Sequence, residues 1–162
     1  MNHGKVYAEI ANGLLKLKER IKAANIPSSK LDETINIATW NIREFGKKKR
    51  SIAAIHYIAE ILGQFDLIGL VELRDNLSDL GRVLEILGPY WRAVYSDMIT
   101  DAGGNRERIA YLYDNVQLPL TAWRRKPINH GLKRALNICP NRRSGAVLIW
   151  LRLNPAASIS WR

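Results

Sequence analysis

The first 114 residues alternate between helical and strand-like patterns of apolar side chains. Apolar residues recur every three or four positions in three segments, which predicts helices with one apolar face each, at 5–24, 51–64 and 78–87. Apolar runs typical of strands lie between and after them, at 35–42, 66–73, 88–99 and 107–114. The resulting order, α, β, α, β, α, β, β, predicts a layered α/β domain.

The first two predicted helices indicate which side chains are buried. The N-terminal helix is basic around an apolar face that consists of Ile10, Leu14, Leu17 and Ile21. We expect it to pack on the periphery of the domain, although a basic amphipathic helix can also bind a membrane or a partner. In the second helix the expected buried face consists of Ile52, Ile55, Ala59 and Leu62. The expected N-caps of the second and third helices are Ser51 and Ser78.

Composition is that of a globular domain. The 162 residues are enough for one domain with a core, and a hydrophobic fraction of 47% argues against wholesale disorder. No apolar run is long enough to span a membrane, and charged residues interrupt the N-terminal segment, unlike a secretory signal. The single cysteine, Cys139, has no partner for an internal disulfide. We therefore expect a cytoplasmic protein without a membrane span.

The net charge of +10 is unevenly distributed along the chain. All 15 acidic residues lie between Glu9 and Asp114, whereas residues 115–162 hold nine basic residues and no acidic one. The same segment holds three of the five tryptophans and four of the six prolines. The chain therefore divides near residue 115 into an almost neutral part and a strongly basic tail.

Three polar residues stand at the ends of predicted strands. Asn41 closes the first strand, Glu72 closes the second, and Glu107 opens the last. Ligands of layered α/β folds gather where strand ends converge, and Mg²⁺ typically takes one or two protein carboxylates there, with water and substrate phosphate as its other ligands. Arginines suited to binding phosphate flank these residues, namely Arg43, Arg74, Arg106 and Arg108. The combination is typical of metal-assisted phosphodiester cleavage.

Each of these residues also has a structural interpretation. An ion pair with Arg74 explains Glu72, and a turn in which the side chain bonds the backbone explains Asn41; composition alone favours both. Glu107 is equally explained as the solvated end of a hairpin. The basic run at 47–50 is typical of a solvated approach to a helix. No spacing that indicates a catalytic or metal-binding pair is found among His3, His56 and His130.

Three ordered motifs shift this balance toward catalysis. A resemblance to the endonuclease/exonuclease/phosphatase family, and within it to the deoxyribonuclease I branch, is carried by the stretches IATWNIREFG, DLIGLVELRDN and GGNRERIAYLYDN. The resemblance covers about residues 30–115. It implies a four-layer αββα sandwich, of which this α/β (α+β) chain would contain the N-terminal half. It also implies a reaction in which a metal-supported water attacks phosphorus.

The resemblance assigns catalytic roles to the three polar residues at the strand ends. Asn41 would lie at the phosphate and metal centre. Glu72 would be the ligand of Mg²⁺, or of Mn²⁺ in its place. Glu107 would orient a catalytic histidine. The implied site is therefore a metal centre at one edge of the sheet.

Substrate binding is assigned to the flanking arginines. Arg74 would contact the backbone or groove of a nucleic acid, Arg106 would approach a phosphate, and Arg43 would lie beside them. Asn105 stands where the deoxyribonuclease I branch has a tyrosine. The sequence contains no strand ending in Thr-x-His, no Gly-Asp-Phe-Asn and no closing Ser-Asp-His, so the general base of the family is missing. The chain as written is therefore expected to be catalytically impaired.

We expect three regions: an N-terminal helix and linker at 1–30, half of the family domain at 31–115, and a basic tail at 116–162. The tail either follows a change of reading frame between about Asn115 and Trp123, or is a basic arm whose tryptophans stack on nucleic-acid bases. Within it, 144–154 has the composition of a strand or an apolar patch. The predicted function is that of a truncated Mg²⁺-dependent nuclease. The alternatives are a phosphoesterase acting on small or lipid substrates and a non-enzymatic nucleic-acid-binding protein.

Overall fold

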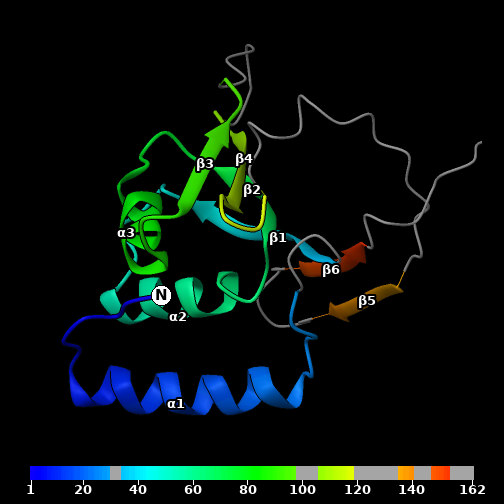
Figure 1. Ribbon diagram of the computed structural model, residues 1–162. Coiled ribbons are helices and arrows are strands. Elements are labelled where there is room, and N and C mark those ends of the chain that lie inside the picture. Colours follow the sequence, from blue (N-terminus) through cyan, green and yellow to red (C-terminus); the bar gives the residue numbers. More distant parts are fainter. Residues whose placement is uncertain (30–33, 98–105, 119–134, 141–146, 154–162) are drawn as a thin grey trace, which may run out of the picture.

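The computed structural model describes residues 1–29, 34–97 and 106–118, together with the backbone of two later strands (Figure 1). Three helices and six strands follow one another as α1 (Ala8–Ala23), β1 (Ile35–Phe45), α2 (Ile52–Leu62), β2 (Leu67–Leu73), α3 (Ser78–Leu87), β3 (Trp91–Tyr95), β4 (Arg108–Asp114), β5 (Ala135–Pro140) and β6 (Val147–Leu153). The predicted element order is confirmed up to β4. The predicted strand within 144–154 is also confirmed, as β6.

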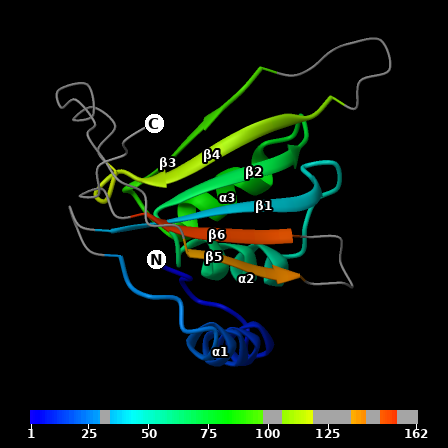
Figure 2. The same ribbon diagram turned by 90° about the vertical axis from the view of Figure 1, so that its right-hand side faces the viewer.

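All six strands belong to one mixed sheet with the order β3-β4-β2-β1-β6-β5 (Figure 2). β1 and β2 are parallel, because α2 lies between them in the chain and returns it to the same edge of the sheet. Every other neighbouring pair is antiparallel. The strand β6 therefore joins the basic tail to β1, in the middle of the sheet.

Helices cover one face of the sheet (Figure 1). α2 and α3 pack beneath the strands, and α1 lies along α2 on the side away from the sheet. The fold is thus mixed α/β, as expected. The described residues comprise a single sheet, so a second sheet, which a four-layer sandwich requires, is not among them. In the same part of the chain, no helix is long and apolar enough to cross a membrane.

The core lies between the sheet and helices α2 and α3. The side chains with least exposure include Phe45, Ile55, Leu62, Ile68, Leu70, Val83 and Leu112. In α2 the buried apolar residues are Ile55, Ile58, Ala59 and Leu62. The expectation that Ile52 belongs to this face is wrong: it is the first residue of the helix and is 51% exposed, outside the packed turns.

Helix α1 packs through the face that the sequence predicts. Ile10 and Leu14 are buried, and Leu17 and Ile21 are half-buried. Because this apolar face is in contact with α2, packing within the domain accounts for its pattern.

Side chains cap the next two helices differently. Ser51 accepts a hydrogen bond from the amide of Ala54 at 3.2 Å, which confirms it as the N-cap of α2. Ser78 is the first residue of α3 and not its cap; its amide and hydroxyl both donate to Oδ1 of Asn76. The loop before α3 is therefore ordered by Asn76, close to the end of β2.

The face of the sheet opposite the helices exposes apolar side chains. Along β4, Ala110 and Leu112 are fully buried toward the helices, whereas Ile109 and Tyr111 are 43% and 49% exposed. Val94 of β3 pairs with Tyr111 across the strands and is 48% exposed. Among the described residues, therefore, helices cover one face and leave an apolar surface on the other.

Candidate active site

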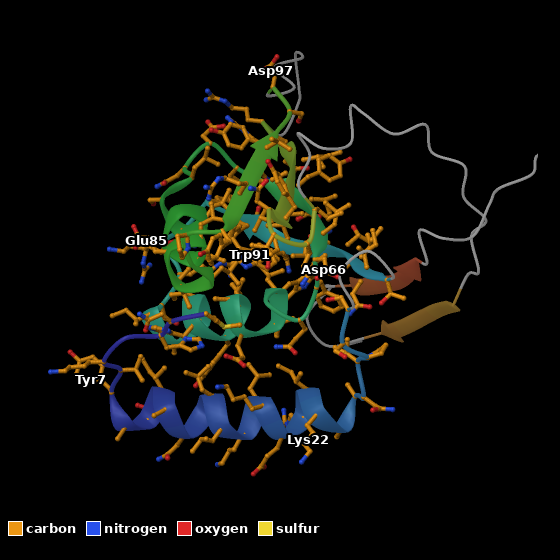
Figure 3. All side chains as sticks on the ribbon, viewed as in Figure 1. Tyr7, Lys22, Asp66, Glu85, Trp91 and Asp97 are labelled. Atoms are coloured by element: carbon orange, nitrogen blue, oxygen red, sulfur yellow. The ribbon has the colours of Figure 1, made fainter. Side chains whose placement is uncertain are left out.

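The parallel pairing of β1 and β2 brings Asn41 and Glu72 together. Both strands point the same way, so residues near their carboxyl ends meet at one edge of the sheet. The amide of Asn41 donates through Nδ2 to Oε1 of Glu72 at 2.5 Å. Figure 3 labels Asp97, which follows β3, and Asp66, which precedes β2, at well-separated positions. The proximity of the two residues, which are 31 positions apart, is thus a property of the fold.

The expectation that Asn41 closes its strand is wrong, because β1 continues to Phe45. The pairing with β2 shifts between Asn41 and Phe45: Asn41 faces Val71, and regular pairing resumes between Phe45 and Leu73. Extra residues on one strand produce a local bulge, and bulges are common beside active sites. The polar residues after Asn41 belong to this irregular part of the strand.

Backbone strain is concentrated at the same edge. The non-glycine residues with positive φ include Glu44 at 50°, Glu72 at 60° and Arg106 at 53°. A left-handed conformation costs a residue with a side chain about 1–3 kcal/mol, and such residues cluster at functional sites. The amide of Glu44 donates to Oε2 of Glu72 at 3.2 Å, so the strained segment is aimed at the carboxylate. The left-handed backbone at Glu44 therefore helps to orient the carboxylate of Glu72.

A glycine turn makes this geometry possible. Gly46 has φ 93°, and a Cβ there would lie 2.3 Å from the carbonyl oxygen of Asn76. The amide of Arg74 donates to the carbonyl of Phe45 at 2.7 Å. Gly46 thus lets the end of β1 approach the loop that follows β2.

Asn41 also carries a polar atom without a protein partner. Its Oδ1 is buried and makes no hydrogen bond to the residues that the structure describes. Such an orphaned acceptor costs about 1–3 kcal/mol unless something else satisfies it. Carboxylate and amide oxygens are ligands that Mg²⁺ accepts, so Glu72 and Asn41 have the chemistry needed to hold such a cation. Among the residues that the structure describes, this site included, no group of three or more His, Cys, Asp or Glu side chains is arranged to hold a metal ion.

Arg74 joins the site to the start of β4. Its Nη2 lies 3.0 Å from Oε1 of Glu107 and 3.6 Å from Oε1 of Glu44. Glu107 reaches this edge because Arg108, the next residue, pairs with Leu73 at the end of β2. The side chain of Arg74 is only 18% exposed, so its guanidinium is held between two carboxylates.

The other predicted arginines lie at the rim of the site. The side chain of Arg106 is 65% exposed and lies 3.3 Å from Oδ2 of Asp75. Arg43 is exposed, and its carbonyl accepts a hydrogen bond from the guanidinium of Arg50. Arg108 stacks over the ring of Tyr95, with 5.6 Å between the guanidinium carbon and the ring centroid. The structure thus brings Arg74 into contact with the carboxylates and leaves Arg43 and Arg106 at the surface.

The basic run at 47–50 has both structural and site contacts. The amide of Arg50 donates to buried Asp79 at 2.7 Å, which ties the run to α3. Lys47 forms an ion pair with Glu44 within the turn. Lys47, Lys48 and Lys49 are exposed, in keeping with a solvated approach to α2, whereas Arg50 is half-buried.

Glu44 is the site residue that the sequence does not reveal. It lies in the motif WNIREF between Arg43 and Phe45, where an acidic residue on a strand is unremarkable. Its hydrogen bond with Lys47 is the main cause that holds the pKa of the Glu44 carboxyl below its usual range. Gly46 was the available signal, since it indicates a turn that brings Lys47 back toward Glu44.

A second polar cluster joins the N-terminal segment to α2. Nδ1 of His3 lies 2.8 Å from Nδ1 of His56, and Nε2 of His3 lies 2.7 Å from Oε2 of Glu60. The spacing of these histidines in the sequence does not indicate this contact, which forms because the chain before α1 folds back across α2. Burial is the main cause that lowers the pKa of His56, and the neighbouring His3 acts in the same direction.

Some predicted features lie outside the described residues. They are Asn105, His130, Trp123 and Trp161, and also the side chain of Trp150 on β6. The two interpretations of the basic tail therefore both stand as predictions.

Comparison with known proteins supports a relationship for part of the chain. No family model matches the sequence. The sequence is 33% identical over 85 residues to Deoxyribonuclease-1 of Oryctolagus cuniculus. The matched stretch covers 49% of this chain and 30% of that protein. The chain is therefore similar to a deoxyribonuclease over about half of its own length, and spans less than a third of that relative.

Proposed function

We propose that residues 31–115 form part of a Mg²⁺-dependent phosphodiester hydrolase of the deoxyribonuclease I type, with nucleic acid as its substrate. One observation carries the proposal: Asn41 and Glu72 on β1 and β2 lie together with Arg74 and Glu107, which directly follow β2 and precede β4, at one strained edge of the sheet. The partial similarity to a deoxyribonuclease gives this arrangement its chemical interpretation.

In the proposed site Glu72 and Asn41 hold the cation. The carboxylate of Glu72 and the orphaned Oδ1 of Asn41 supply oxygen ligands, in keeping with the few protein ligands that Mg²⁺ uses. A bound Mg²⁺ would neutralise charge on the phosphate and activate water. Asn41 keeps the Glu72 carboxylate oriented through its hydrogen bond, so the ligand is preorganised.

Arginines bind the phosphate groups of the substrate in this proposal. Arg74 is fixed by Glu107 and Glu44, and its planar guanidinium matches the oxygens of a phosphate. Arg106 and Arg43 lie at the exposed rim, where neighbouring phosphates of a long substrate would pass. Glu107 positions Arg74, in addition to the role in orienting a histidine that the family resemblance implies.

We propose the remaining features of the chain on the same basis. The apolar face of the sheet, which includes Ile109 and Tyr111, is the surface on which the second sheet of a four-layer sandwich would pack. The family motifs that supply a general base are missing from the sequence, so cleavage by this chain is expected to be several orders of magnitude slower than in an intact enzyme.

Metal binding is the appropriate test, because it does not depend on turnover. In titrations of the full chain with Mn²⁺, followed by electron paramagnetic resonance, Glu72→Gln should weaken binding about tenfold or more. Glu85→Gln is the matched control, since Glu85 is an exposed carboxylate on α3. Equal Mn²⁺ affinity in the two variants would exclude Glu72 as the ligand.

Substrate class needs a separate comparison. In a full-length form with the missing family motifs restored, cleavage of supercoiled plasmid in Mg²⁺ should exceed cleavage of a small phosphodiester at the same phosphate concentration, and EDTA should abolish it. Faster cleavage of the small phosphodiester would favour a phosphoesterase in place of a nuclease.

A further inference from the structure

Glu44 lies between the proposed metal ligand Glu72 and the basic side chains Lys47 and Arg74. Its backbone amide donates to Glu72, the proposed metal ligand. Its carboxylate is paired with Lys47 and lies 3.6 Å from Nη2 of Arg74. Glu44 therefore contacts Glu72, which would hold the metal ion, and also Lys47 and Arg74, which would hold the phosphate.

Stability does not account for an acidic residue at this position. Glu44 has φ 50°, a conformation that disfavours any residue with a side chain. Its side chain is 36% exposed, and ion pairs at that exposure contribute little, because water screens them. The free-energy cost of the left-handed backbone therefore exceeds the stabilisation from the ion pairs, which points to a role in binding.

The chemistry of the pair that Glu44 contacts indicates this role. Lys47 and Arg74 are donors without acceptor capacity, and both bind carboxylate and phosphate oxygens alike. A carboxylate between them therefore occupies a position that suits a phosphate oxygen. Arg74 keeps its shorter contact with Glu107, at 3.0 Å, so it stays in place when Glu44 moves.

We propose that Glu44 is a specificity-determining residue, whose carboxylate occupies the phosphate-binding position between Lys47 and Arg74 and must be displaced by the substrate. This inference rests on the proposed function. A single phosphate must break both contacts of the Glu44 carboxylate and replaces them only with its own contacts to Lys47 and Arg74. A nucleic acid compensates for the same displacement with further phosphates at Arg43 and Arg106, so Glu44 selects polyanions against isolated phosphate esters.

The charge of Glu44 agrees with this role. Its carboxylate, paired with Lys47 and close to Arg74, is an anion at neutral pH, as is any ordinary glutamate. An anion at this place repels phosphate until it is displaced.

The test measures binding of the full chain to a labelled double-stranded DNA oligonucleotide in EDTA, over a series of salt concentrations. Glu44→Gln removes the charge and keeps the side-chain shape. It should tighten binding about three- to tenfold and steepen the slope of log Kd against log salt by about one, the change expected for one more phosphate contact. Glu85→Gln changes the net charge equally, far from the site, and should shift Kd less than twofold.

A second variant separates this inference from effects on folding. Glu44→Gly also removes the carboxylate, and glycine adopts φ 50° without strain, so this variant should fold at least as well as the wild type. It too should bind DNA more tightly. Inorganic phosphate should compete with DNA more effectively in both Glu44 variants than in the wild type.

The outcomes distinguish the inference from the proposed function. If Arg74→Gln weakens DNA binding while both Glu44 variants bind like Glu85→Gln, the gating role of Glu44 is wrong and the nuclease proposal stands. If neither the wild type nor any variant binds the oligonucleotide, both are wrong. If Glu44→Gln and Glu44→Gly bind DNA more tightly than the wild type and Glu85→Gln does not, the result supports both the role of Glu44 and the proposed function.

Discussion

Gly46 allows the turn at the end of β1 to be tested with a single methyl group. Gly46→Ala places a Cβ on a residue with φ 93° and 2.3 Å from the carbonyl oxygen of Asn76. The contact is with backbone, so no side chain can rotate away. Either the turn or the loop before α3 must shift, and both lie against the site.

Two effects should lower the free energy of unfolding of Gly46→Ala. A positive φ costs an alanine about 1–2 kcal/mol, and relief of the clash costs about as much again, by comparison with other overpacking substitutions. Gly46→Ala should therefore lower the free energy of unfolding by about 2–4 kcal/mol. The Cβ would lie 3.6 Å from Cβ of Arg74, which is an ordinary van der Waals contact, so the clash falls on the backbone of Asn76.

Gly81 provides a control with the same chemical change and the opposite expected sign. It lies within α3, and a Cβ there meets nothing within 4 Å. Because alanine favours the helix, Gly81→Ala should raise the free energy of unfolding by about 0.5–1 kcal/mol.

Urea unfolding followed by circular dichroism measures both variants. With a denaturant dependence of about 1–3 kcal/mol per molar, Gly46→Ala should lower the midpoint by about 1–2 M, whereas Gly81→Ala should raise it. Equal midpoints for the two alanine variants would refute the close approach of Gly46 to Asn76, and with it the geometry assigned to the site.

Two further predictions concern pH. Burial and His3 lower the pKa of His56, so its contribution to stability is present above its unfolded pKa of about 6.5 and is lost as the pH falls through the lower folded value. Between pH 7 and 5 the urea midpoint of His56→Gln should therefore fall less than that of the wild type, and parallel curves would contradict this. Burial also raises the pKa of Asp66 despite its hydrogen bond from Asn36, so its contribution is full below an unfolded pKa of about 3.9 and is lost as the pH rises through the raised folded value. The stability of the wild type relative to Asp66→Asn should therefore decline from about pH 3.5 to 6, and a rising difference would contradict the assignment.

Periodicity was sufficient to locate the helices and most strands. The helix at 78–87 is observed with the predicted bounds, because its apolar spacing and its flanking Leu77 and Gly88 leave little choice of register. The strand Leu67–Leu73 is likewise clear from its largely apolar run. The spacing of apolar residues predicts such elements because their buried side chains recur at the regular period of a helix or strand.

The end of β1 could not be predicted in the same way. Its last residues, Arg43 and Glu44, are polar, and polar residues at this position indicate a loop. They belong to the strand because the pairing of Phe45 with Leu73 resumes after the bulge. That pairing depends on a neighbouring strand, which is not visible in a local window of sequence.

Contacts between distant segments were the least accessible to sequence. Asn41 and Glu72 could be placed together, since parallel strands of one sheet bring their ends to one edge. The contact between His3 and His56 could not, because it depends on the path of the residues before α1. The position of Glu44 among the site residues depends in turn on the left-handed backbone that only the folded turn imposes.

The concentration of left-handed residues at one edge has a consequence for how this sequence tolerates mutation. A library selected only for abundance in the cell should enrich glycine or asparagine at Glu44, Glu72 and Arg106, because either relieves the backbone at these positions. A library selected for binding or turnover should retain the native side chains. Positions at which the two selections disagree would therefore trace the boundary of the site without any ligand being known.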